Sequence, residues 1–236
     1  AGRTTLNGEG LQHEDGHSHI LASTIPNCLA YDPSFAYEVA VIMQNGLKRM
    51  VQDQENVFYY ITLLNENYAM PGLQAGTEEQ IIKGMYLLSE PQPSAQGLQV
   101  NLLGCGSILR ESIAAQKLLQ EDWGVSANVW SCPSFNELAR EGQDCERWNL
   151  LHPTATPRVS FVAQQLGKYV GPVVASTDYM KAYAEQIRPF LPNGRRYKVL
   201  GTDGFGRSDF RYRLREHFEI NRHYIAVAAL KALQED

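Results

Sequence analysis

The sequence has few of the features that mark specialised classes of protein. Its four cysteines, at positions 28, 105, 132 and 145, are scattered and form no CxxC pair, which gives no support to a zinc ribbon or a redox motif. It contains no apolar run of about 18 residues, so no membrane span is expected. The net charge of −5 provides no basic surface for nucleic acid. We therefore expect a cytoplasmic protein with reduced thiols that binds neither membranes nor nucleic acid.

The start of the chain lacks two further features. The first residues, AGRTTLNG, contain neither an initiator Met nor the apolar stretch of a signal peptide. The chain is therefore expected to be a processed product or a fragment. Its 236 residues suffice for one large domain or two smaller ones.

Hydrophobic periodicity predicts an alternation of strands and helices. Short β-branched or aromatic segments predict strands over residues 25–31, 57–64, 98–103, 125–132, 172–176 and 197–200. Apolar residues at helical spacing predict helices over residues 33–52, 76–86, 108–123, 179–188, 208–218 and 221–233. Repeated strand–loop–helix units predict an α/β fold with a mostly parallel sheet and helices on both faces.

Several local signals refine this prediction. Ser134, with Glu137 three residues later, is expected to cap a further helix, and Asp178 is expected to cap the helix over 179–188. The segment VFYYITLL at 57–64 is apolar nearly throughout, so we expect a strand covered on both faces. Residues 89–97, rich in Pro, Ser and Gln, are the best candidate for a linker.

Two glycine-rich stretches follow predicted strands. Residues 104–107, GCGS, resemble an anion-binding turn, but position 109 is Leu, so the third Gly of GxGxxG is missing and a structural tight turn is favoured over dinucleotide binding. Cys105 within this turn is a weak candidate for a catalytic thiol, because no neighbour in the sequence would lower its pKa. Residues 201–209 lead into arginines at 207, 211, 213 and 215, for which a solvated helix face is favoured over an interface.

The densest group of titratable residues lies in residues 6–20, LNGEGLQHEDGHSHI. His13, Glu14 and His17 match the letters of the HExxH zinc-protease motif, which requires both histidines on one face of a helix. The glycines in and before the motif disfavour that helix. The alternatives are a looser metal site with His17 and His19, a polar surface loop, or a loop that presents His13 to a ligand bound mostly by other parts of a larger protein.

Five long motifs carry a resemblance to a known family: LNGEGLQHEDGHSH, YYITLLNENYAMP, SFNELAREGQDCERWN, STDYMK and GTDGFGRSD. Together they resemble the homodimeric pyruvate dehydrogenase component of bacterial pyruvate dehydrogenase complexes, over essentially the whole chain. This chain would be about the last quarter of such a protein. The resemblance implies thiamine diphosphate and Mg2+ as cofactors, pyruvate as substrate, a homodimer, and the lipoyl domain of dihydrolipoyl acetyltransferase as the partner that receives the acetyl group.

The resemblance also implies a domain division and a site. Residues 1–90 would be the C-terminal portion of a pyrimidine-binding, thiamine-diphosphate-type domain, and residues 97–236 a transketolase C-terminal-like domain with a mostly parallel sheet and flanking helices. His13 would be an active-site histidine that faces the cofactor, and Glu9 would lie in the same active-site stretch. His17 and His19 match the family without an assigned role.

The family's thiamine signature, a Gly-Asp-Gly followed by an Asn pair, is absent from this chain. The cofactor-binding residues and the Mg2+ ligands are therefore expected upstream, and the chain alone is expected to be inactive. Two alternatives to the enzyme remain: a non-catalytic dimerisation or assembly module, and a zinc hydrolase that uses His13, Glu14 and His17.

Overall fold

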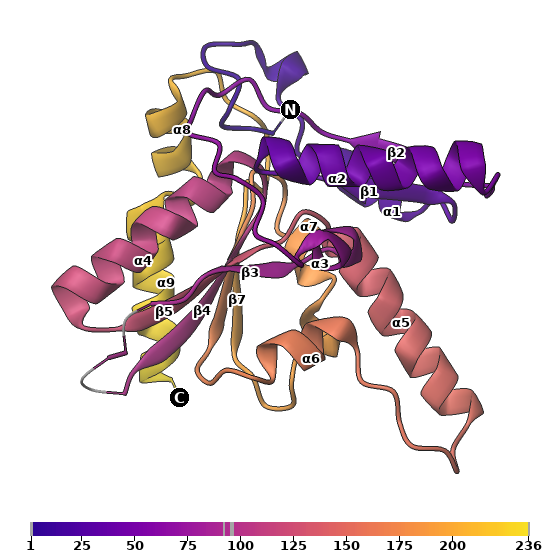
Figure 1. Ribbon diagram of the computed structural model, residues 1–236. Coiled ribbons are helices and arrows are strands. Elements are labelled where there is room, and N and C mark those ends of the chain that lie inside the picture. The colour runs from indigo at the N-terminus through magenta and orange to yellow at the C-terminus, as the bar shows by residue number, and fades with distance from the viewer. Residues whose placement is uncertain (1, 92, 95–96, 236) are drawn as a thin grey trace.

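The protein is described by a computed structural model that covers residues 2–91, 93–94 and 97–235 (Figure 1). Two sheets organise it: a two-stranded sheet near the N-terminus and a five-stranded sheet formed by the rest of the chain. Three residues of the predicted linker at 89–97, namely Gln92, Ala95 and Gln96, lie outside the described residues.

The N-terminal part contains the histidine-rich segment and the smaller sheet. Strands β1 (Cys28–Tyr31) and β2 (Phe58–Ile61) pair in parallel, with Cys28 opposite Phe58 and Tyr31 opposite Ile61. The crossover between them is α2 (Ala36–Leu47), which continues into a π-helical turn, η2 (Lys48–Gln52). The remaining elements are η1 (Leu11–His13), α1 (Ser18–Ser23) and α3 (Glu78–Lys83).

The expectation that the strand at 57–64 is covered on both faces holds only in part. Strand β2 spans only Phe58–Ile61 and pairs with β1 alone, and the Phe58 side chain is 44% exposed. An apolar sequence indicates that the strand can be buried, but it does not identify the elements that pack against it. Within the described residues, Tyr59 and Ile61 belong to a cluster with side chains of α2 and α3, and Tyr60 packs in a cluster that includes Ala22 of α1.

The larger sheet has the strand order β3-β5-β4-β6-β7. Its strands are β3 (Tyr86–Ser89), β4 (Gln99–Gly104), β5 (Ser126–Ser131), β6 (Val173–Ser176) and β7 (Tyr197–Leu200). All neighbours pair in parallel except β3 and β5, which are antiparallel. The mostly parallel sheet predicted from the strand–loop–helix alternation is therefore confirmed.

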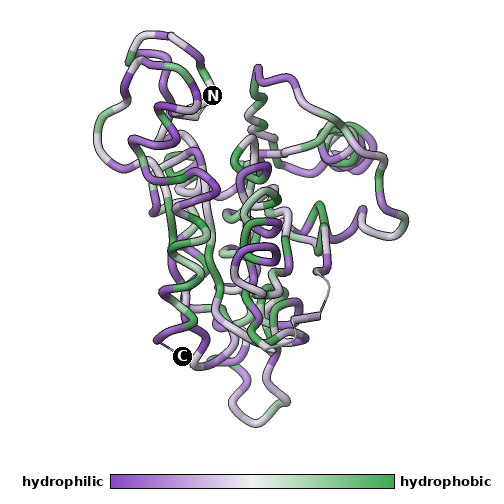
Figure 2. Tube along the Cα trace, turned by 90° about the vertical axis from the view of Figure 1, so that its left-hand side faces the viewer, coloured by the Kyte–Doolittle hydropathy of each residue, from purple (hydrophilic) through white to green (hydrophobic). Residues whose placement is uncertain are grey.

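Helices cover both faces of this sheet (Figure 1). On one face, α4 (Leu109–Trp123) and α9 (Arg222–Gln234) pack on apolar side chains of β4, β5 and β6. On the other face lie α5 (Phe135–Leu151), α6 (Phe161–Leu166) and α7 (Ala182–Glu185). Figure 2 shows the hydrophobic stretches gathered along the sheet and the helices that face it. A short helix, α8 (Arg211–His217), lies beside the N-terminal segment.

Local signals account for several of the helix boundaries. The Ser134 hydroxyl accepts a hydrogen bond from the Glu137 backbone N–H at 3.0 Å and begins α5, as predicted. The predicted cap at Asp178 is wrong, because α7 begins only at Ala182 and the Asp178 carboxylate binds residues near the N-terminus instead. None of the helices in the described part of the chain is long and apolar enough to cross a membrane.

Candidate functional site

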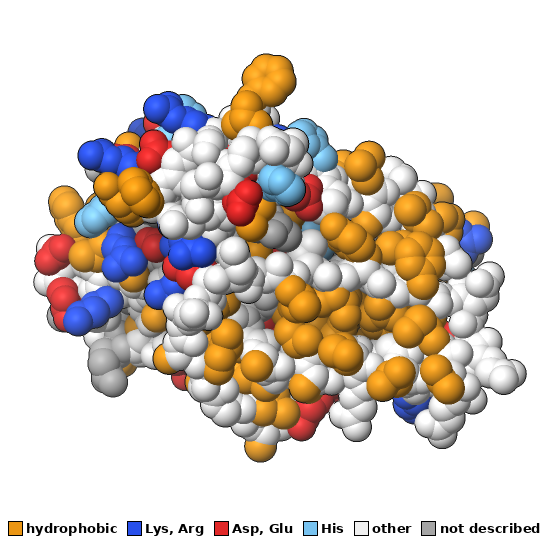
Figure 3. Space-filling view, turned by 90° about the horizontal axis from the view of Figure 1, so that it is seen from above, with side chains coloured by type: hydrophobic (Ala, Val, Ile, Leu, Met, Phe, Trp, Pro, Cys, Tyr) orange, Lys and Arg blue, Asp and Glu red, His pale blue; other side chains and the backbone are white. Residues whose placement is uncertain are grey.

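The histidine-rich segment lies against the loop formed by residues 201–209 of the C-terminal part. The Gly8 backbone N–H donates to the Asp209 carbonyl oxygen at 3.0 Å, and the Arg207 backbone N–H donates to the Glu14 carboxylate. Figure 3 shows this end of the molecule from above, with histidine, acidic and basic side chains gathered over the N-terminal segment and α8. Two stretches nearly 200 residues apart in the sequence thus form one surface.

The backbone rules out the zincin geometry for the HExxH letters. The 3-10 helix η1 ends at His13, Glu14 has φ −87° and ψ 88°, and α1 begins only at Ser18. His13 and His17 therefore do not share a helix face, which the zinc site requires. No group of three or more His, Cys, Asp or Glu side chains that could hold a metal ion occurs among the described residues. The zinc-hydrolase alternative has no geometric basis here.

His13 and Glu9, the two predicted site residues, are both exposed on this surface. Within the described residues, neither side chain makes a hydrogen bond, so both are available to face a ligand. No hydrogen bond links these two described side chains to each other. Their roles stay predictions. His17 is also exposed, with its ring nitrogens 3.4 and 3.5 Å from the Arg3 guanidinium.

Sequence reasoning missed the buried groups that lie beneath this surface. Arg3 is 3% exposed and donates to the Thr202 carbonyl oxygen, while Glu14 is 7% exposed. Burial raises the pKa of the Glu14 carboxyl, opposed by the Arg207 backbone hydrogen bond and by the charge of Arg3. Burial likewise lowers the pKa of Arg3, opposed by Asp15 and other nearby acids. The two opposite charges thus lie near each other in the interior, and each lowers the cost of burying the other.

The residues before the histidine-rich segment are anchored by Asp178. Its carboxylate accepts hydrogen bonds from the Thr4 backbone N–H at 2.9 Å, the Thr4 hydroxyl at 2.6 Å and the Thr5 hydroxyl at 2.8 Å. The Thr5 hydroxyl also lies 2.6 Å from the Ser107 hydroxyl. Asp178 therefore fastens the N-terminal segment to the C-terminal sheet, which explains why it does not cap α7.

The arginine stretch is only partly the solvated face that the sequence favours. Arg213 is exposed, but Arg215 is 6% exposed and pairs with Glu66 and, at 3.6 Å, with Glu111. Glu111 also accepts from Arg222 at 2.9 Å. These ion pairs join the loop that contains Glu66 to α4, α8 and α9. For Arg215, the predicted solvated role is wrong because two carboxylates from distant segments meet its guanidinium.

A second buried polar group lies under α1. The Thr62 hydroxyl donates to the Asp32 carboxylate at 2.7 Å and lies 3.0 Å from the His19 Nε2 atom. The His19 ring stacks on Tyr183 at a centroid separation of 4.6 Å. His19 therefore has a structural setting in the interior, not an exposed position suited to a metal site with His17.

The turn at 104–107 is a structural tight turn, as favoured. Gly106 has φ +51°, its backbone N–H donates to the Asp32 carbonyl oxygen at 3.1 Å, and a Cβ there would collide with the Asp32 carboxylate. The turn thus packs closely against an acidic side chain of the protein, which supports a structural role. Cys105 is fully buried, which raises its pKa well above the ordinary value. A catalytic thiolate at this position is therefore excluded.

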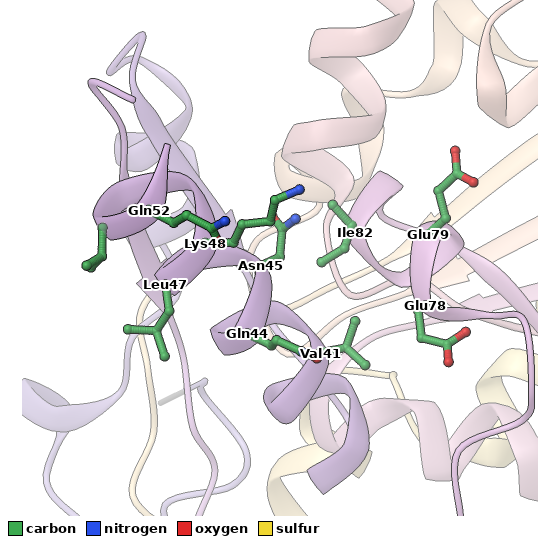
Figure 4. A pocket seen from close by; sticks show the side chains of 10 residues that line it. Val41, Gln44, Asn45, Leu47, Lys48, Gln52, Glu78, Glu79 and Ile82 are labelled. Atoms are coloured by element: carbon green, nitrogen blue, oxygen red, sulfur yellow. The ribbon is translucent and has the colours of Figure 1, made fainter. Parts of the chain in front are cut away.

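A separate surface hollow lies between the outer sides of α2, η2 and α3 (Figure 4). Apolar side chains and a few amide and charged groups line it: Val41, Gln44, Asn45, Leu47, Lys48, Val51, Gln52, Glu78, Glu79 and Ile82. None of its residues belongs to the histidine-rich segment. Its apolar lining suits packing against another surface better than acid–base chemistry.

The chain is similar in sequence to one family of enzymes along its whole length. The family model for the pyruvate dehydrogenase E1 component middle domain matches residues 1–71, and the model for the transketolase-like C-terminal domain matches residues 84–221. The pyruvate dehydrogenase E1 component of Cupriavidus necator is 61% identical over all 236 residues, and that of Escherichia coli K12 is 60% identical over 99% of the chain. The chain spans 26% of the length of each of these relatives.

Solved structures with the same fold are transketolases at low sequence identity. Transketolase from Leishmania mexicana is 17% identical, with a TM-score of 0.67 over 99% of this chain and 29% of that one. A split-gene transketolase described as an inactive β4 tetramer is 16% identical, with a TM-score of 0.59 over 95% of this chain and 63% of that one. At these identities the likeness shows the fold alone.

Proposed function

Because the chain belongs to the pyruvate dehydrogenase E1 component family and carries its transketolase-like C-terminal domain, we propose that the protein containing it decarboxylates pyruvate and reductively acetylates the lipoyl group of dihydrolipoyl acetyltransferase. The observation that carries this proposal is 61% identity over the full 236 residues, including the histidine-rich segment. We expect the enzyme to act in the cytoplasm as a homodimer, as the family resemblance implies.

Thiamine diphosphate with Mg2+ is the cofactor that the proposal requires, and the described residues of this chain do not fit its binding site. They contain no cluster of acidic or histidine side chains able to hold a metal ion. The glycine-rich turn at 104–107 packs against the acidic side chain of Asp32, and it lacks the third Gly of the GxGxxG pattern. We therefore propose that the cofactor is bound by residues outside this chain, and that this chain contributes side chains on the substrate side.

His13 is the residue that we propose to act on the substrate. Its imidazole is exposed, and an imidazole side chain can act as a general acid or base. We propose that it donates to, or exchanges a proton with, the oxygen or carboxylate derived from pyruvate. Glu9, exposed in the same stretch, is proposed to line the same site, with a role that the described contacts do not define.

The rest of the chain is proposed to support assembly. We propose that residues 1–90 complete a pyrimidine-binding domain and that residues 97–236 form a C-terminal domain that stabilises the dimer. Exposed apolar side chains along α2 and η2 support a covered surface there, since Met43, Leu47 and Val51 are each at least half exposed in this chain. An isolated chain of this extent would then act only as an assembly module, which is the second candidate function.

The proposal is tested in the full-length enzyme with a histidine pair. His13→Ala should lower pyruvate decarboxylation by about 100-fold, the range expected for loss of one acid–base group. His223→Ala, which removes an exposed histidine at the start of α9, is the matched control and should leave turnover unchanged. Normal turnover and normal pyruvate affinity in His13→Ala would show that His13 does not have the proposed role.

A further inference from the structure

Glu14 and His13 are neighbours in the chain but have opposite environments. His13 is exposed, whereas the Glu14 side chain turns into the protein and is 7% exposed. In the zincin hypothesis Glu14 would have been a general base beside a metal. The structure instead buries most of the Glu14 side chain against the loop at 201–209, which leaves it little exposed surface from which to act on a substrate.

The buried Glu14 carboxylate is held by the loop at 201–209. The Arg207 backbone N–H donates to it, and the preceding Gly206 makes room for it, because a Cβ at Gly206 would collide with the Glu14 carboxylate. Arg3 supplies a positive charge nearby, and its guanidinium is itself fixed by the Thr202 carbonyl oxygen of the same loop. The loop at 201–209 therefore accommodates the buried Glu14 carboxylate.

The segment around His13 is held partly by its own backbone hydrogen bonds. The His13 backbone N–H donates to the Gly10 carbonyl oxygen and the Glu14 backbone N–H to that of Leu11, and both bonds are local to the segment. It is linked to the C-terminal part on both sides of His13: the Gly8 backbone N–H donates to Asp209, the Glu14 carboxylate accepts from Arg207, and the Gly16 carbonyl oxygen accepts from the Met180 backbone N–H at 3.0 Å. The position of His13 therefore depends on attachments on both sides of it, and the Glu14 carboxylate is the attachment adjacent to it in the sequence.

We propose that Glu14 is a positioning residue for His13, holding the histidine-bearing segment on the loop at 201–209 of the C-terminal part. The inference rests on the proposed function, because it assigns Glu14 a purpose only if His13 acts on the substrate. In this inference the loop at 201–209 of the C-terminal part also helps to position His13. A displacement of a catalytic group by about 1 Å can lower turnover by about 100-fold, so the loss of this attachment has a measurable effect.

The test uses the full-length enzyme and a double-mutant cycle. Glu14→Ala should lower kcat at least about tenfold with a smaller change in KM, whereas Glu14→Gln, which keeps an oxygen to accept from Arg207, should stay within about threefold of the wild type. In the His13→Ala background, Glu14→Ala should have little further effect, since residues that act as a unit are not additive. Glu111→Ala, which removes a buried carboxylate away from this segment, controls for general destabilisation and should leave kcat unchanged.

Deuterium uptake of residues 8–14 provides a readout that does not need activity. It should rise in Glu14→Ala, but not in Glu14→Gln or Glu111→Ala, because only the first variant removes the attachment of residue 14 to the loop. Losses that multiply in the double variant, or unchanged deuterium uptake in Glu14→Ala, would overturn the inference. A wild-type enzyme that is inactive with pyruvate would instead refute the proposed function, with the uptake result still deciding whether Glu14 holds the segment.

Discussion

Asp32 and His19 lie buried on either side of the Thr62 hydroxyl, and burial shifts their pKa values in opposite directions. It lowers the pKa of His19 to about 4, opposed by the charge of Asp15. It raises the pKa of Asp32 to about 7, opposed by the hydrogen bond from Thr62. At pH 5 the unfolded chain therefore has a charged His19 and a charged Asp32, while both are neutral in the folded protein.

These two shifts have opposite effects on stability. Between pH 4 and 6.5 the unfolded His19 binds a proton that the folded one does not, so its contribution to the free energy of unfolding rises with pH. Over a similar range the folded Asp32 binds a proton that the unfolded one does not, so its contribution is present at low pH and is lost as pH rises toward 7. One proton corresponds to about 1.4 kcal/mol per pH unit, so the two slopes should nearly cancel.

Replacing either Asp32 or His19 should reveal the pH dependence of the free energy of unfolding that the other residue contributes. In Asp32→Asn, the free energy of unfolding should rise by about 3 kcal/mol between pH 4 and 6.5 relative to the pH dependence of the wild type. In His19→Gln, it should fall by a similar amount over this range. Urea denaturation at half-unit pH steps measures both, with the exposed Asp144→Asn as control. If the free energy of unfolding varies with pH in both variants as it does in the wild type, the two residues do not contribute the opposing pH dependences described here.

Two further predictions concern buried groups. Arg215→Met should lower the free energy of unfolding by about 3 kcal/mol, because it leaves Glu66 and Glu111 with one fewer buried cation; a denaturant midpoint equal to that of the wild type would contradict this. Cys105 should resist iodoacetamide in the folded protein at pH 8 and react only on unfolding, because it is fully buried and its pKa is raised. Mass spectrometry of the alkylated protein checks this, and labelling of Cys105 in the folded state would count against it.

The sheet could be predicted from sequence because its signals are local. Each strand at 98–103, 125–132, 172–176 and 197–200 is a short apolar run followed by a loop and a helix pattern, and the parallel pairing follows from that alternation. Strand β3 was not predicted, because its Tyr86–Ser89 segment lies at the end of an expected helix and pairs antiparallel with β5. Helix α6 is short and also gave no distinct signal.

The buried part of the site could not be predicted, since it depends on contacts between distant residues. Glu14 and Arg207 are 193 positions apart, and Thr4 and Asp178 are 174 apart. The letters around Glu14 instead suggested a metal site, and the letters around Asp178 suggested a helix cap. A local pattern identifies a polar residue that needs a partner, but it does not show which distant segment supplies that partner.

The measurement that tests the central claim most directly is reductive acetylation of a lipoyl domain of dihydrolipoyl acetyltransferase by the full-length protein. With pyruvate, thiamine diphosphate and Mg2+ present, mass spectrometry should show an acetylated lipoyl group, formed much more slowly by His13→Ala than by the wild type. Absence of the acetylated product with the wild type, or equal rates for the two proteins, would contradict the account.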